Sequence, residues 1–165
     1  MYIEFDTLPD NSRIWIYQAT DFMPYERVER VSARMINFLQ DWQAHGKDLQ
    51  ASFKIEYDRF IIVALSEASY QATGCSVDKL VRQIQELEKE LNISLMDRTQ
   101  IAFRDSDNTM IDTMHMVNFR AALECGDLDE NTTVFNNLID TKKELKNHWE
   151  VPVSKSWHRQ WLPIA

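Results

Sequence analysis

The feature that most constrains the fold is the alternation of short strand-like segments with two long apolar stripes at helical spacing. Residues 13–19 carry apolar side chains on both faces, which is typical of a central strand. Residues 25–44 and 77–91 each place apolar side chains on one helical face. Ser76 is the expected N-cap of the second helix, and Gly46 the expected left-handed C-cap of the first.

The remaining strands are predicted from short runs of apolar and β-branched residues. These runs lie at 52–57, 59–65, 99–104 and 110–116. The resulting order is β-α-β-β-α-β with one extra hairpin strand, which is the order of a ferredoxin-like antiparallel sheet covered on one face by two helices. We therefore predict the α+β class and a single domain over residues 1–165, with a core at 13–116 and a C-terminal helical extension at 117–165.

Composition and charge exclude several classes of protein. A chain of 165 residues that is 44% hydrophobic can bury a core without disulfides or a metal. Its net charge of −8 disfavours nucleic acid and anionic membranes as partners. Two distant cysteines do not form a disulfide framework, and residues 1–6 carry neither a basic nor an apolar leader region. We therefore expect a soluble cytoplasmic protein that spans no membrane.

Motifs that depend on glycine or histidine are missing from the sequence. The three glycines are scattered, so the chain contains no P-loop, no dinucleotide-binding turn and no Gly-x-Ser-x-Gly elbow. The four histidines lack the His-x-x-x-His spacing of a zinc site. We expect no metal and no cofactor, and we favour a function other than catalysis.

The most distinctive local feature is a hydroxyl-rich turn at the start of the second helix. Free amides and the positive end of the helix dipole favour an anion at such a position. The residues expected to bind it are Thr73, Gly74, Cys75, Ser76 and Arg82. The same field would activate Cys75 as a thiolate nucleophile, which is the alternative catalytic interpretation. The structural interpretation is a capped helix with a small buried cysteine, and it is the one that we favour.

Two further groups of residues lie in the C-terminal third. Asn136 and Asn137 could bind polar groups of a ligand, although asparagine more often ties down a turn. His158 lies in a tail that holds three of the five tryptophans, Trp149, Trp157 and Trp161. This aromatic tail could cover a core edge, which we favour, form an interface for self-association, or line a ligand pocket.

Several segments together resemble one family of small bacterial proteins of about this length, which often carry the automatic name "ABC transporter ATPase". The segments that carry the resemblance are 8–10, 13–18, 74–78, 134–138 and 156–158. The family name implies ATP hydrolysis, but this chain has neither a phosphate-binding loop nor a Ser-Gly-Gly signature. The resemblance therefore implies no catalytic residues that could be assigned here.

The sequence favours a non-hydrolytic module that binds a small anionic ligand or a protein partner near 73–78, with Asn136, Asn137 and His158 as neighbours. The first alternative is an enzyme that uses Cys75 as a thiol nucleophile or redox centre. The second is a structural protein that self-associates into a homo-oligomer through its tryptophan-rich tail.

Overall fold

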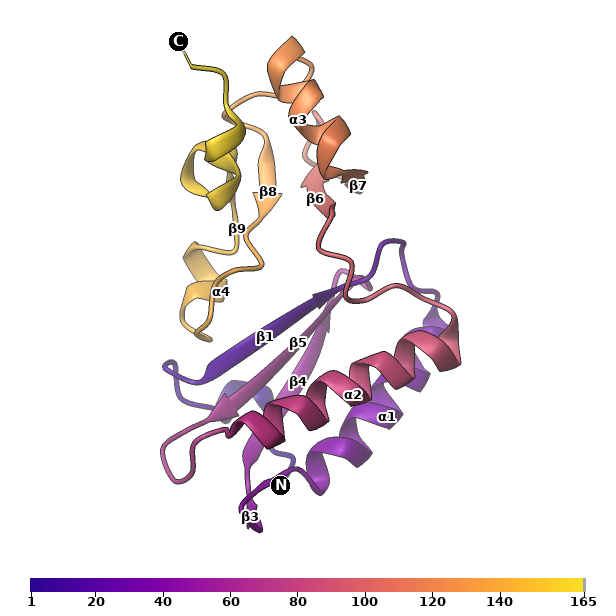
Figure 1. Cartoon of the computed structure of the whole chain (residues 1–165), viewed down its shortest axis with the longest axis vertical. Coiled ribbons are helices and arrows are strands. Elements are labelled where there is room, and N and C mark those ends of the chain that lie inside the picture. Colours follow the sequence, from indigo (N-terminus) through magenta and orange to yellow (C-terminus); the bar gives the residue numbers. More distant parts are fainter. Residues whose placement is uncertain (165) are drawn as a thin grey trace. The chain divides into compact units, whose positions relative to one another are not determined.

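The computed structural model describes residues 1–164, which form two compact units (Figure 1). Unit 1 consists of Met1–Met96 together with Asp140–Lys143. Unit 2 consists of Asp97–Ile139 and the residues from 144 onward. The boundary therefore falls after Met96, whereas the sequence placed a core boundary at residue 116.

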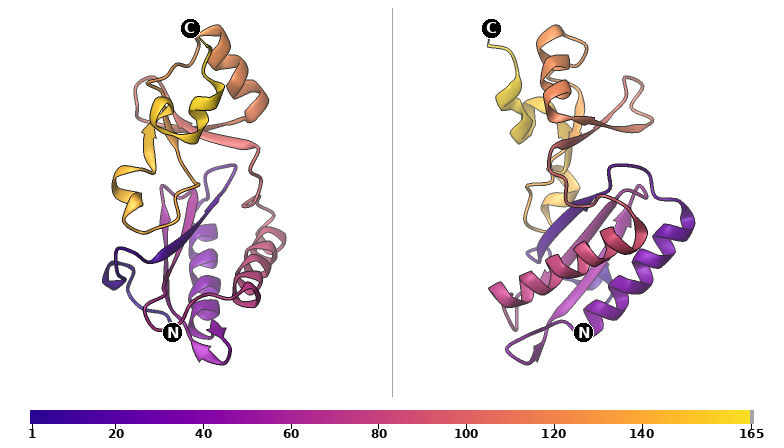
Figure 2. Two further views of the ribbon diagram at one scale, coloured as in Figure 1. Left: turned by 60° about the vertical axis from the view of Figure 1, so that its left-hand side comes forward. Right: turned by 45° about the vertical axis from the view of Figure 1, so that its right-hand side comes forward.

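Unit 1 is a three-stranded antiparallel sheet with two long helices on one face (Figures 1 and 2). The strands, in the spatial order β1-β5-β4, and the helices are β1 (Arg13–Gln18), β4 (Gln50–Glu56), β5 (Phe60–Ser66), α1 (Tyr25–Gln40) and α2 (Gly74–Leu91). The core between the helices and the sheet contains Ile61, Val63 and Leu65 of the central strand, none of which is exposed. A short 3-10 helix, η1 (Phe5–Thr7), packs against β4.

The α+β class is confirmed, but the strand expected to complete a ferredoxin-like sheet lies elsewhere. β6 (Gln100–Arg104), the predicted fourth strand, pairs with strands of unit 2. The edge of β1 that it would have joined is instead bonded by the returning chain, where the Ile14 amide donates to the Asp140 carbonyl at 2.9 Å. At the opposite edge of the sheet, the Ile3 amide donates to the Ala51 carbonyl at 3.0 Å. Both edges of this sheet are thus bonded by neighbouring segments of unit 1.

The two tight turns of unit 1 explain where its helix and strands end. α1 ends at Gln40 rather than at residue 44, and a small hairpin of β2 (Gln43–Ala44) and β3 (Lys47–Asp48) follows it. Gly46 is left-handed, with a φ of 73°, but it forms the turn of this hairpin and does not cap the helix. The β4–β5 turn is also tight, with three residues between the paired Glu56 and Phe60, and its Tyr57 and Asp58 both adopt positive φ.

Unit 2 is built from short elements. Its four-stranded sheet has the order β7-β6-β8-β9 and adds β7 (Ile111–His115), β8 (Thr133–Phe135) and β9 (Glu150–Pro152) to β6. Its helical elements are α3 (Met116–Cys125), α4 (Glu144–Asn147), η2 (Val153–Lys155) and η3 (Trp157–Trp161). The predicted hairpin of the fourth and fifth strands is confirmed. The sequence patterns did not reveal β8 and β9, because three residues are too few to establish a period.

Candidate ligand groove between two helices

The predicted anion site at the start of α2 is a capped helix end. Thr73 is the N-cap, and Ser76, which was predicted to be the cap, lies three residues further on. The Thr73 Oγ1 accepts a hydrogen bond from the Ser76 amide at 3.2 Å, and the Ser76 Oγ accepts one from the Thr73 amide at 2.7 Å. This reciprocal arrangement is a capping box. Both hydroxyl groups therefore already serve the helix end.

The remaining predicted residues of this helix are exposed. Gly74 and Cys75 lie in the first turn, and within residues 1–164 no acceptor pairs with either amide. Arg82 lies further along the helix and is also exposed. Cys75 was expected to be a buried thiol in the structural interpretation, but its side chain is exposed. Unit 1 contains one histidine, His45, and within residues 1–164 no hydrogen bond or ion pair joins it to Cys75.

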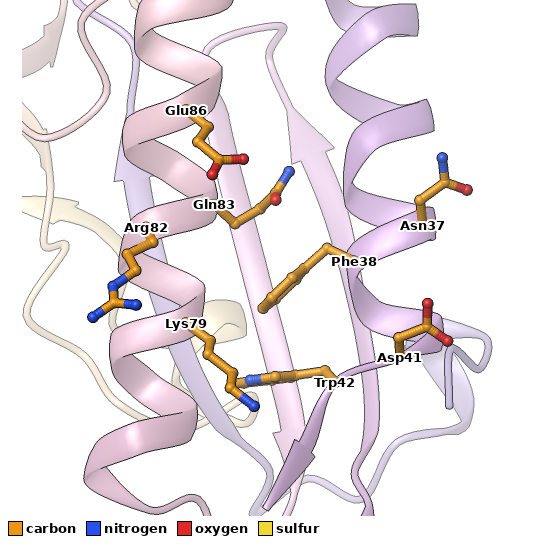
Figure 3. A pocket seen from close by; sticks show the side chains of 8 residues that line it. All are labelled: Asn37, Phe38, Asp41, Trp42, Lys79, Arg82, Gln83 and Glu86. Carbon is orange, nitrogen blue, oxygen red and sulfur yellow. The ribbon is translucent and has the colours of Figure 1, made fainter.

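Next to this helix end, α1 and α2 enclose an open groove of about 380 Å³ (Figure 3). The groove belongs entirely to unit 1, and its lining residues are Asn37, Phe38, Asp41, Trp42, Lys79, Arg82, Gln83 and Glu86. Of the residues predicted to form a ligand site, Arg82 is the one that lines it. The other lining residues were missed because Phe38 and Trp42 belong to an apolar stripe that indicates core packing, which is their role as well.

Trp42 forms a fixed floor at one end of the groove. The indole Nε1 donates a hydrogen bond to the carbonyl of Ser76 at 2.8 Å, and the side chain is 1% exposed. The ring also packs against Phe38 and Trp15, with centroid distances of 5.5 and 5.9 Å. The hydrogen bond joins the chain just beyond the C-terminus of α1 to the first turn of α2.

The charged residues around the groove differ in whether they have partners. Glu86 shares one partner with Glu90, because the Arg34 guanidinium lies 3.2 Å from Glu86 and 3.4 Å from Glu90. Lys79 and Arg82, by contrast, make no ion pair or hydrogen bond with any residue in the described part of the chain. They lie three residues apart on the same helix, so they are neighbours on its surface. The α2 side of the groove therefore has two unpartnered cations, of which Lys79 is directed toward Trp42 and Arg82 away from the space between the helices (Figure 3).

The two predicted asparagines belong to unit 2 and stabilise its own loop. The Asn136 Oδ1 accepts a hydrogen bond from the Leu138 amide at 3.2 Å. The Asn137 Oδ1 accepts one from the Trp149 indole Nε1 at 2.9 Å. These bonds match the structural interpretation of the pair, and neither residue lines the groove of unit 1.

His158 is part of the aromatic core of unit 2. It is 2% exposed, its Nδ1 lies 2.7 Å from the Ser156 Oγ, and its ring stacks on Trp157 at a centroid distance of 4.0 Å. Burial lowers the pKa of His158 to about 4, so the imidazole is neutral at pH 7. The tail tryptophans pack here too, since Trp161 contacts Phe119. The tail therefore contributes to the core of this unit, the role that we favoured for it.

A second cavity, of about 440 Å³, lies within unit 2 beside the β6–β7 turn. Two of its carboxylates, those of Asp105 and Asp129, accept hydrogen bonds from nearby backbone amides. Asp105 accepts hydrogen bonds from the amides of Met110 and Thr109, which lower the pKa of the carboxyl group. The carboxylate of Asp129 accepts a hydrogen bond from the Asn131 amide at 2.8 Å. These contacts are typical of polar turns.

Residues 1–164 contain neither a metal-binding cluster nor a membrane-spanning helix. No group of three or more histidine, cysteine, aspartate or glutamate side chains is placed to hold a metal ion. No helix in that range has both the length and the apolar character needed to cross a bilayer.

In comparisons with protein-family models, with curated proteins and with solved structures, nothing matches the chain. The function proposed below therefore rests on the geometry of the chain itself.

Proposed function

We propose that the protein is a non-hydrolytic binding module whose α1–α2 groove takes a small amphipathic anion. The observation that carries this proposal is an unpartnered cation, Lys79, beside an aromatic floor. Most surface cations of such a helix would offer charge alone. Here the charge lies near Phe38, which is half-buried and points into the groove, so one ligand can contact both a cation and an apolar surface.

The physical basis is that an anion gains charge contacts without displacing an existing carboxylate. Two unit charges about 4 Å apart near a protein surface attract by roughly 4 kcal/mol before solvation and salt reduce that energy. Lys79 reaches from α2 toward Trp42, and Phe38 points into the space between the helices, whereas Arg82 points away from that space (Figure 3). Lys79 is accordingly the main charge contact that we assign to the ligand, with Arg82 at the rim.

The experiment is a calorimetric titration of the full chain with 3-phenylpropanoate, which combines a carboxylate with an aromatic ring. We expect saturable binding that Lys79→Gln weakens about fivefold, as one exposed charge contact would. Lys89→Gln is the matched control, because Lys89 is exposed on the last turn of the same helix. Absence of binding to the wild-type chain, or equal weakening by the two substitutions, would overturn the proposal.

A second candidate function is a thiol-dependent reaction at Cys75. It is supported by the exposure of the cysteine in the first turn of α2, beside amides that have no acceptor. Cys125 is a built-in control, because it is also exposed but lies at the end of α3. The candidate requires iodoacetamide to modify Cys75 much faster than Cys125 at neutral pH, as mass spectrometry of the labelled peptides would measure. Similar slow rates would eliminate it.

A further inference from the structure

We propose that the ligand of the α1–α2 groove is a phenolic acid, which is an aromatic ring with a short carboxylate arm at one end and a hydroxyl group at the other. The carboxylate would lie against Lys79, the ring against Phe38, and the hydroxyl group against the amide of Gln83. This inference rests on the proposed function, because it uses the same groove and the same cation, and it specifies the chemical class of the ligand.

The first observation is a side-chain amide that the fold leaves without a partner. Gln83 lines the groove and is half-buried, yet its side chain makes no hydrogen bond with any of the residues 1–164. A partly buried amide in this state has lost contacts with water and has gained none from the protein. The amide group can both accept and donate a hydrogen bond, and so can a hydroxyl group. A ligand hydroxyl group is therefore a suitable partner for Gln83.

The second observation is the order of the groups along the groove. Figure 3 shows the ammonium group of Lys79 toward one end, the amide of Gln83 further along α2, and the Phe38 ring between them. Lys79 and Gln83 are four residues apart, so they lie on the same face of the helix. A ligand lying along that face would pass from a cation, over an aromatic ring, to an amide. A phenolic acid has its three parts in the matching order.

The third observation is the charge beyond Gln83. Glu86 lines the groove one turn further along α2, and it shares the Arg34 guanidinium with Glu90 (Figure 3). Two carboxylates and one guanidinium leave this end of the groove negative, so a second carboxylate on the ligand would be repelled there. A phenolic hydroxyl group keeps its proton at pH 7 and can donate a hydrogen bond. The groove therefore favours a ligand with one anionic end and one uncharged donor end.

The fourth observation is the aromatic surface in a small space. Phe38 is half-buried and points into the groove, and its ring packs against the buried Trp42 at a centroid distance of 5.5 Å. An aromatic ligand would extend this pair through offset or edge-to-face contact. The volume of about 380 Å³ lies near the lower end of the range of ligand pockets, which is roughly 300–1,000 Å³. Such a space suits a single substituted ring better than a nucleotide.

The test compares 3-phenylpropanoate with three derivatives that carry a 4-hydroxyl, a 2-hydroxyl or a 4-carboxyl group on the ring, in calorimetric titrations of the full chain. We expect the 4-hydroxyl derivative to bind about fivefold more tightly than 3-phenylpropanoate, as one added hydrogen bond would. The 2-hydroxyl group lies beside the carboxylate arm, away from Gln83, and should give no gain. The 4-carboxyl derivative should bind more weakly, because its second charge approaches Glu86.

Gln83→Met removes the amide and keeps a side chain of similar length. It should abolish the advantage of the 4-hydroxyl derivative and leave the affinity for 3-phenylpropanoate unchanged. Gln85→Met is the matched control, because Gln85 is exposed on the same helix and does not line the groove. It should change neither affinity. Lys79→Gln should weaken both ligands by about the same factor.

Three results would overturn the phenolic acid while the anion-binding function stands. The first is equal affinity for the 4-hydroxyl and 2-hydroxyl derivatives. The second is a 4-hydroxyl advantage that persists in Gln83→Met, and the third is a 4-carboxyl derivative that binds as tightly as the 4-hydroxyl one. If none of the four compounds binds, both the phenolic acid and the anion-binding function fail.

Discussion

Unit 1 covers one face of its sheet with two helices of 16 and 18 residues, whereas unit 2 relies on one 10-residue helix and short 3-10 turns. Long helices supply apolar stripes that fill a core with aliphatic side chains. In unit 2, Phe103 and Phe119 share the core with aliphatic side chains, and the partly buried Trp157 and Trp161 pack against it. The packing of unit 2 also buries His158, whereas no acidic, basic or histidine side chain is fully buried among the described residues of unit 1. The stabilities of the two units should therefore change differently when a core side chain is truncated and when the pH is lowered.

The largest expected effect is the loss of the central ring of unit 2. Phe119 is fully buried and contacts Phe103, His158 and Trp161 at centroid distances of 5.7, 5.9 and 6.2 Å. Phe119→Ala should lower the free energy of unfolding of unit 2 by about 3–5 kcal/mol. Urea denaturation followed by amide NMR would measure it, with the signals of α1 and α2 persisting after those of unit 2 are lost.

The control for that substitution is Val117→Ala in the same helix, since Val117 is 62% exposed. It should change the free energy of unfolding by no more than about 0.5 kcal/mol. If the signals of both units disappear together in Phe119→Ala, the distinction between the two cores has no consequence for stability.

The next effect is the acid sensitivity of unit 2. The pKa of His158 is about 4 in the folded chain and about 6.5 when the chain is unfolded. Between these values the unfolded state binds more protons, so stability is fully present above pH 6.5 and decreases as the pH falls toward 4. The shift corresponds to roughly 3 kcal/mol.

The measurement is the free energy of unfolding at pH 7 and pH 4.5 for the wild-type chain and for His158→Phe, which keeps an aromatic ring on Trp157. The loss between the two pH values should be smaller in the variant, because a phenyl ring takes up no proton. Equal losses in the two proteins would show that His158 does not cause the acid sensitivity.

The third effect concerns the β1 edge of the unit 1 sheet, which the segment 140–143 covers. Lys142 Nζ donates hydrogen bonds to the carbonyls of Leu8 at 2.6 Å and Asp6 at 3.1 Å, next to the backbone bond between Ile14 and Asp140. Lys142→Met removes both side-chain bonds while keeping an apolar stem, and should destabilise unit 1 by about 1–2 kcal/mol. Hydrogen exchange of the Ile14 amide is the sharpest readout. Unchanged protection there would contradict a structural role for this segment in closing the sheet.

Sequence reasoning was most reliable where one residue pattern had one structural meaning. The alternation at 13–19 and the stripe at 77–91 predicted β1 and most of α2, because their periods extend over many residues. It was less reliable where distant segments compete for one position. Nothing local in 99–104 distinguishes a strand beside β1 from a strand in a second sheet, and the segment that occupies that edge lies about forty residues later.

The candidate site shows the same limit. Arg82 was identified from charge near a helix start, but Phe38 and Trp42 could not be separated from the core by spacing alone, because one aromatic face packs inward while another part lines the groove. Asp41 lay inside the predicted helix 25–44, between stripe residues, and gave no signal of its own. Conversely, Ser76 and His158 were singled out as polar residues in suggestive positions, and both are buried. Burial depends on tertiary packing, which a local pattern does not record.

The smallest effect separates the cap of α2 from the groove beside it. Thr73→Ala removes the side-chain acceptor for the Ser76 amide and should cost about 1 kcal/mol of stability in unit 1. It should leave the affinity for 3-phenylpropanoate unchanged, because Thr73 does not line the groove. Cys75→Ser is the control, because Cys75 is exposed and lies two residues further along the same helix start. It should change neither the stability nor the ligand affinity. A large loss of ligand affinity in Thr73→Ala at unchanged stability would instead indicate that the ligand binds at the start of α2, as predicted from the sequence.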